Sequence, residues 1–120
     1  MNKMFSFTKH EREILPNFRQ KIGNAESTED VKKFFVYTVK ELFKNVFEGQ
    51  MEFYYEEFEL TPDSKPYYRL SKRLLSSKNF TSVWNHSDLS RVVNRLAESS
   101  LRRYMHLEKH PEKTDSKIRM

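Results

Sequence analysis

Apolar side chains recur at helical spacing over most of the chain, and the pattern is clearest at 28–47. There they fill a wide face at positions i, i+3, i+4 and i+7, and further apolar residues nearly encircle the helix. Ser27 or Thr28 can cap its start, because a hydroxyl oxygen accepts a hydrogen bond from the first turn. Glu29 and Asp30 follow where negative charge is favourable. A helix this apolar is expected at the centre of the fold.

Other segments show a similar period with a narrower apolar face. Residues 8–22 predict a helix in which Pro16 is expected to cause a kink or a fresh start, because proline lacks a backbone donor. Residues 88–110 predict a long last helix. A short amphipathic helix is expected at 67–77, and a short helix or irregular segment at 80–84.

Residues 50–60 are ambiguous. Their aromatic density is typical of a strand. Four side chains nevertheless follow the helical spacing i, i+3, i+4, i+7: Met51, Tyr54, Tyr55 and Phe58. Strict alternation would place Glu57 and Glu59 on the apolar face of a strand, so we predict a helix here. Its apolar face points away from that of 28–47, which predicts either a break at Gly49 or a helix buried on both sides.

The resulting expectation is an all-α fold. A single compact domain, residues 1–110, is predicted to hold four or five helices around the central helix at about 28–47, with a turn at 61–66. Residues 111–120 are expected to form a disordered basic tail. The alternative is an α+β fold with a short hairpin at about 51–70.

Composition excludes several classes of site. Two glycines, Gly23 and Gly49, cannot assemble a dinucleotide fingerprint, a phosphate loop or a nucleophile elbow. The absence of cysteine removes disulfides and thiolate ligands, and fits a reducing compartment. His106 and His110 are four residues apart, but no further zinc ligand is fixed by spacing. We expect no cofactor, no metal and no catalytic residues, and a cytoplasmic protein that does not enter a membrane.

Charge is distributed unevenly along the chain. Residues 1–60 contain 9 Lys and Arg against 11 Asp and Glu, a net charge of −2, and residues 61–120 contain 13 against 6, a net charge of +7. The basic half supplies the candidate residues for binding an anionic partner: Arg91, Arg95, Arg102, His106 and Lys109 in a row on the last helix, with Arg69 and Arg73 before it. Guanidinium groups suit phosphates and carboxylates, although solvated charges are the ordinary content of an exposed helix face.

The acidic half contains a second stripe. If 50–60 is helical, four carboxylates share one side: Glu48, Glu52, Glu56 and Glu59. The predicted function is a non-enzymatic binding module whose basic C-terminal helix engages nucleic acid or an acidic protein surface. One alternative is a self-associating structural or adaptor protein, in which the two stripes pair across a homodimer. Another is a small-ligand binder or an enzyme with an aromatic pocket.

Overall fold

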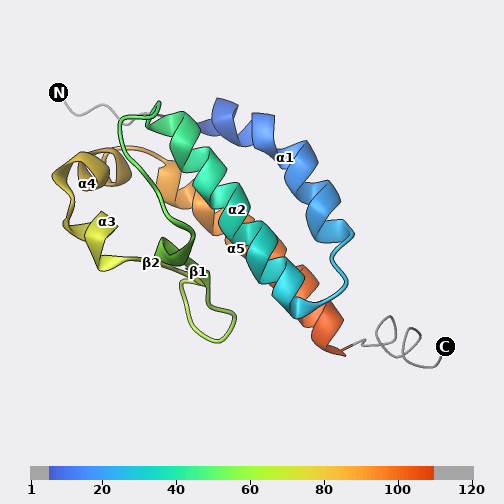
Figure 1. Ribbon diagram of the computed structural model, residues 1–120. Coiled ribbons are helices and arrows are strands. Elements are labelled where there is room, and N and C mark those ends of the chain that lie inside the picture. The colour runs from blue at the N-terminus through green and yellow to red at the C-terminus, as the bar shows by residue number, and fades with distance from the viewer. Residues whose placement is uncertain (1–5, 110–120) are drawn as a thin grey trace.

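Three long helices form the centre of the molecule (Figure 1). The computed structural model describes residues 6–109. Helices α1 (Thr8–Gly23), α2 (Thr28–Val46) and α5 (Leu89–Lys109) pack on one another, and α2 contacts both of the others over its length. The predicted fold of four or five helices with one at the centre is confirmed within the described residues, where a small two-stranded hairpin accompanies five α-helices.

The central helix begins where its cap was predicted. The Ser27 hydroxyl accepts a hydrogen bond from the Asp30 N–H at 3.1 Å, and the Asp30 carboxylate accepts one from the Glu26 N–H at 3.2 Å. The apolar face of α2 is buried, with Phe35 and Leu42 at most 1% exposed. Burial on this scale, rather than helix propensity, is what holds such a helix in place.

The chain reverses direction directly after α2, so the break predicted at Gly49 is confirmed, although the helical face at 50–60 from which it was inferred does not exist. The helix ends at Val46, and two residues of the following turn adopt positive φ, 53° at Glu48 and 76° at Gly49. Left-handed backbone is accessible to glycine and stops a helix. The chain then returns alongside α2 and buries Phe53.

The helix predicted over 50–60 is wrong, and the hairpin alternative is right. A 3₁₀ turn, η1 (Tyr55–Glu57), leads into β1 (Phe58–Leu60), which pairs antiparallel with β2 (Tyr68–Leu70). Phe58 lies opposite Leu70, and Leu60 lies opposite Tyr68. The alternation is that of a half-buried strand, because Phe58 and Leu60 face the core.

The Glu57 carboxylate, which argued against a strand, is neutralised by a residue that is distant in the sequence. Glu57 is buried, and it accepts hydrogen bonds from Arg73, from the Ser71 hydroxyl and from the Tyr54 N–H. Glu59 faces outward and pairs with Arg69 on β2. Buried charge is tolerated only when it is paired, and here the partner comes from beyond the hairpin.

Two short helices follow the hairpin. The helix predicted at 67–77 is wrong in its first half, which is strand β2; its second half is α3 (Lys72–Ser76), followed by α4 (Lys78–Asn85). Serine caps separate the elements: Ser71 accepts from the Leu74 N–H at 3.3 Å, and Ser77 accepts from the Phe80 N–H at 3.2 Å. The turn predicted at 61–66 is the hairpin loop.

A cluster of aromatic rings joins the hairpin and α4 to the central helix. Phe43 on α2 contacts five other rings at centroid distances of 5.3–6.2 Å: Phe47, Phe53, Phe58, Phe80 and Trp84. Most of these contacts are tilted or edge-to-face, the geometry that aromatic pairs prefer. The predicted helical core is confirmed as well, since Val93 and Leu96 on α5 are also at most 1% exposed.

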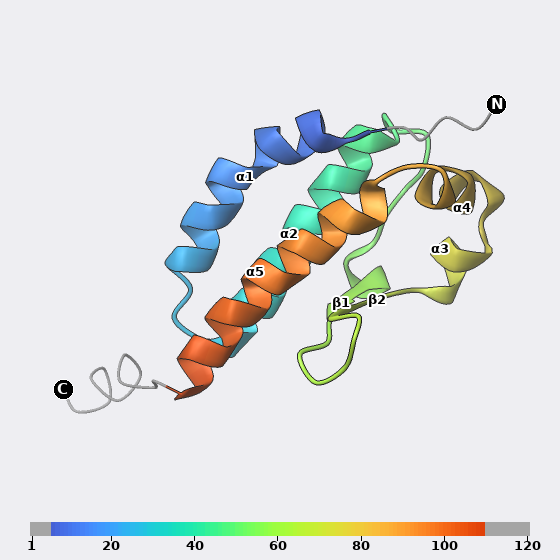
Figure 2. The ribbon, with the colours of Figure 1, turned by 180° about the vertical axis from the view of Figure 1, so that it is seen from behind.

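Helices α1 and α5 meet where each begins. The Asp88 carboxylate accepts a hydrogen bond from the Phe7 N–H at 2.7 Å. α1 continues through Pro16 as one curved helix, so the fresh start considered there does not occur (Figure 2). No helix within residues 6–109 has both the length and the apolar character needed to cross a bilayer. His110 and the tail predicted at 111–120 lie outside the described residues.

Candidate anion-binding surface

The outer face of α5 carries the predicted basic row, but the row is not uniformly basic. Arg91, Arg102 and Lys109 are exposed there, as is His106. Glu98 stands seven residues after Arg91 and four before Arg102, which places its carboxylate on the same face. The row therefore carries less positive charge than a count of its basic residues indicates.

Arg95 is committed to a contact between helices. Its Nη2 lies 2.7 Å and its Nε 2.9 Å from the carboxylate oxygens of Glu11 on α1. Glu11 is buried, and this bidentate pair raises the pKa of Arg95 further above its usual range. Arg102 donates only to the Ser99 hydroxyl, at 3.2 Å. The two arginines consequently differ in role: Arg95 holds α5 against α1, and Arg102 remains at the surface.

The predicted acidic stripe does not exist as a helix face. Its members lie on separate parts of the chain: Glu48 in the turn after α2, Glu52 in the return segment, Glu56 in η1 and Glu59 in β1. Within residues 6–109 no ion pair joins these carboxylates to the basic row of the same chain, and pairing of the two stripes across a homodimer stays a prediction. Ion pairs instead join Arg69 to Glu59 and Arg73 to Glu57.

Arg73 clamps the base of the hairpin. Its Nε lies 2.6 Å from Glu57 Oε2, and its Nη2 donates both to Glu57 Oε1 at 2.8 Å and to the Glu52 carbonyl at 2.6 Å. These hydrogen bonds lower the pKa of Glu57 below its usual value. The Arg73 guanidinium also lies over the Tyr54 ring, 5.3 Å from its centroid. Arg73 thus holds the hairpin in place, while 48% of its side chain remains exposed.

Arg69, Arg91 and Arg95 line two adjoining hollows that share Tyr68. One hollow, of about 410 Å³, lies between β2 and the first turns of α5 and is lined by Ser90, Arg91, Asn94, Arg95 and Tyr68. The other, of about 390 Å³, lies among the hairpin loop, α3 and α4. It is lined by Thr61, Ser64, Lys65, Pro66, Tyr68, Arg69, Leu70, Leu75 and Trp84. We call the two together the basic hollow.

Every charged side chain that lines the basic hollow is cationic. Lys65, Arg69, Arg91 and Arg95 contribute, and no carboxylate lies in either lining. Arg69 and Arg95 are partly neutralised by their pairs with glutamates outside the hollow. Lys65 and Arg91 form no ion pair with any residue of the described chain. Cations in a concave surface focus a positive potential on the space that they enclose.

Two aromatic rings complete this surface. Tyr68 and Trp84 meet at 6.3 Å with their planes at 76°, and Trp84 stacks at 5.5 Å on the buried Phe80, which fixes its position. Burial raises the pKa of the Tyr68 phenol, so its hydroxyl stays protonated at neutral pH and can donate a hydrogen bond. Both rings are half-buried.

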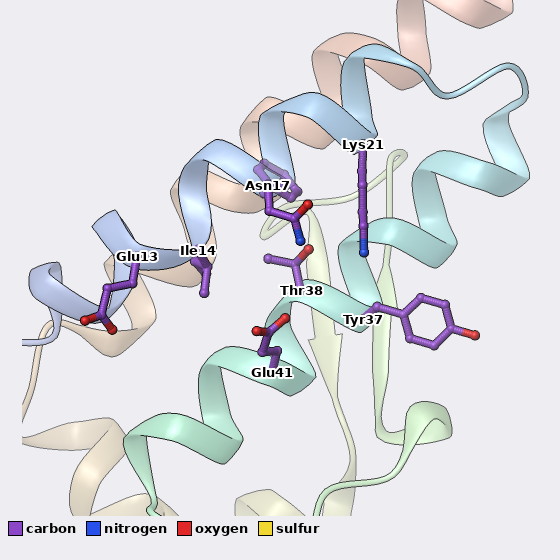
Figure 3. A pocket seen from close by; sticks show the side chains of 8 residues that line it. Glu13, Ile14, Asn17, Lys21, Tyr37, Thr38 and Glu41 are labelled. Atoms are coloured by element: carbon purple, nitrogen blue, oxygen red, sulfur yellow. The ribbon is translucent and has the colours of Figure 1, made fainter.

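Another hollow, between α1 and α2, has mixed charge (Figure 3). It measures about 160 Å³, and its walls carry Glu13, Lys21 and Glu41 together with Asn17 and Thr38. Asn17 and Lys21 extend from α1 toward α2. The lining contains no histidine, serine or cysteine. Within the described residues, His, Asp and Glu side chains form no group of three that could hold a metal ion.

The fold and this surface define a small, mainly helical protein with a basic hollow between its hairpin and its last helix. Comparisons with protein-family models, with curated proteins and with solved structures gave no significant match.

Proposed function

We propose that the protein is a binding module for single-stranded nucleic acid, which it holds in the basic hollow. The observation that supports this most strongly is the lining itself, which combines four cations and two half-exposed aromatic rings with no carboxylate. Single strands are bound by this combination, because cations follow the phosphates and aromatic faces stack on bases whatever their sequence.

Each lining group has a distinct role in the proposed complex. Arg91 and Lys65, which have no intramolecular ion pair among the described residues, contact phosphates from opposite sides of Tyr68. Trp84 and Tyr68 offer their rings to bases or riboses. Asn94 and Ser90 on α5 supply neutral hydrogen-bonding groups beside Arg91.

The more distant cations of α5 act at longer range. Arg102 and Lys109 lie beyond the basic hollow on the exposed side of the same helix. They raise the positive potential along α5 and increase the rate of encounter with a polyanion, an effect that salt screens. In this proposal the predicted basic row contributes to binding mainly through its first residue, Arg91.

Trp84 provides the readout, because it is the one tryptophan of the chain and it lines the basic hollow. Its fluorescence is followed while unlabelled single-stranded DNA or RNA of about ten nucleotides is added at several salt concentrations. Duplex DNA and polyglutamate are titrated in parallel. We expect the single strands to bind and to change the emission, because a stacked base alters the surroundings of the indole ring.

Two variants of opposite expectation test the location. Lys65→Gln combined with Arg91→Gln removes both unpaired cations, and the slope of log K against log salt is expected to flatten by about 1.4, since each single-strand phosphate contributes about 0.7. Arg102→Gln makes one of the same charge changes on the same helix outside the hollow, and should alter the slope little. Binding of polyglutamate in preference to single strands would contradict the proposal, as would an absence of polyanion binding at low salt.

A further inference from the structure

A second surface lies on the exposed side of α2 (Figure 1). A groove of about 740 Å³ runs between α2 and the segment that returns beside it. Its helix wall consists of Tyr37, Lys40, Glu41, Lys44 and Asn45, and its other wall of Gly49, Met51, Glu52, Phe53 and Tyr54. Helix α5, whose first turns line part of the basic hollow, lies in front of α2 only when the molecule is turned by 180° (Figure 2).

Three tyrosines are unusually exposed at this groove. Tyr37 and Tyr54 are each 48% accessible and Tyr55 is 39% accessible. The Tyr37 and Tyr55 rings contact each other at 5.3 Å and form a ridge beside the groove. Tyrosine is enriched where proteins meet, because it buries a large area and loses few rotamers on binding. A partner that carries a ridge of its own can insert that ridge into the groove.

The two walls of the groove carry opposite charge. Lys40 and Lys44 outnumber Glu41 on the α2 wall, whereas Glu52 is the charged side chain of the other wall, with Glu48 and Glu56 elsewhere along the returning segment and outside the lining. None of these six side chains forms an ion pair within residues 6–109. The groove therefore has a basic side, an aromatic centre and an acidic side, so the charge changes sign across its width.

We infer that this groove is the interface of a homodimer related by a two-fold axis. In such an interface both copies use the same patch. A contact between one residue of the first copy and a second residue of the partner is therefore repeated with the roles of the two copies exchanged. A patch with one basic and one acidic wall is complementary to itself under that rotation: Lys40 and Lys44 of one copy meet Glu52 and Glu56 of the other, and the reverse contact follows. The tyrosine ridge of each copy then enters the groove of its partner.

The inference is independent of the proposed function. It uses Lys40, Lys44, Glu52 and Glu56, none of which lines the basic hollow. It also differs from pairing with the row on α5, because the basic partners of the acidic side chains are the lysines of α2.

Sedimentation equilibrium tests the inference with paired charge reversals in the full chain. One variant carries Lys40→Glu and Lys44→Glu, and a second carries Glu52→Lys and Glu56→Lys. Each alone brings like charges together at both contacts, and its self-association constant should fall by about a hundredfold or more. An equimolar mixture of the two restores opposite charges at both contacts and should associate about as well as the wild type. Lys72→Glu combined with Lys78→Glu, on α3 and α4, is the control, because it changes net charge by the same amount as Lys40→Glu with Lys44→Glu.

Two further measurements keep the inference open to contradiction if a reversed chain folds poorly. Added salt should weaken the wild-type dimer, and Tyr55→Ser should weaken it without changing net charge. Rescue in the mixture would support the two-fold arrangement, because a general loss of folding cannot be repaired by a second damaged chain. A wild type that stays monomeric at low salt and submillimolar concentration would overturn the inference, as would a dimer that both reversals leave unchanged.

Discussion

The ion pair between Glu57 and Arg73 should make the stability of the hairpin depend on pH. Glu57→Gln removes the charge but keeps the size of the side chain and one carbonyl oxygen. In the wild type this buried carboxylate accepts two hydrogen bonds from Arg73, one from the Ser71 hydroxyl and one from the Tyr54 N–H. The substitution therefore weakens the contact that fixes the start of β1 to the residues after β2.

The expected loss is about 2 kcal/mol at pH 7. Hydrogen bonds to a charged group contribute roughly 1.5–3 kcal/mol, and breaking a fully buried pair costs about 3–5 kcal/mol. The lower part of this span applies because the Arg73 side chain is 48% exposed, so water screens the pair. For a chain of this length the loss corresponds to a fall of roughly 8 °C in the melting temperature.

The pH dependence follows from the lowered pKa of Glu57. A carboxylate whose pKa is depressed by folding adds stability above its unfolded pKa, near 4.5, and loses that contribution as the pH falls through the folded value. The difference in unfolding free energy between wild type and Glu57→Gln should consequently be largest at pH 7 and should become smaller below about pH 4.5. Urea unfolding followed by circular dichroism at a series of pH values measures it.

The adjacent glutamate supplies a matched control. Glu59→Gln makes the same chemical change two residues further along, where the Glu59 and Arg69 side chains are 51% and 70% exposed. Exposed pairs contribute little, so this variant should lose less than about 0.5 kcal/mol at any pH. Equal losses for the two variants, or a loss at Glu57 that is the same at acid and neutral pH, would refute the reasoning.

Three further predictions concern the helical core and its ends. Leu42→Ala, at a fully buried site, should lower the unfolding free energy in urea by about 2–5 kcal/mol. Leu75→Ala, at a side chain that is 51% exposed, should lower it by well under 1 kcal/mol, and similar losses for the two variants would contradict the assignment of Leu42 to the core. Ser27→Ala should cost about 1 kcal/mol by the same assay through loss of the α2 cap, and Ser27→Thr should recover most of it. A double-mutant cycle with Glu11→Gln and Arg95→Gln should give a coupling of about 1–2 kcal/mol, and additive effects would show that the pair does not join α1 to α5.

The long helices were predictable because their signals are local. At 28–46 the period of apolar residues, the Ser27 cap directly before the helix and the first-turn acids are all local, and at 89–109 the period of apolar residues is local as well. The break at Gly49 followed from comparing two neighbouring faces. Helix–helix burial does not alter such patterns, so the sequence read in short windows was sufficient.

The hairpin was not predictable in the same way, because its decisive partner is distant. Glu57 counted against a strand until Arg73, sixteen residues later, was known to lie beside it. The alternation of Phe58, Glu59 and Leu60 was present in the sequence, but three residues are too few to outweigh a helical spacing over eight.

The basic hollow depends still more on tertiary structure. Tyr68 and Arg91 are twenty-three positions apart and become neighbours only when β2 packs beside α5. The predicted residue Arg91 does line this hollow, whereas Ser90, Asn94 and Lys65 were missed. One signal was available and unused: Glu98 interrupts the basic row and could have indicated that charge concentrates toward its start.

The position of Tyr68 has a consequence for how the molecule opens. The hairpin and α4 are held to α2 through the rings around Phe43, whereas α5 belongs to the three-helix bundle. Such parts can exchange their amide protons as separate cooperative units, with the smaller one opening more often. A ligand that spans Tyr68 and Arg91 would tie these units together, so bound ligand should slow amide exchange in β2 toward the rate of α5, and the hairpin and the bundle would then open together.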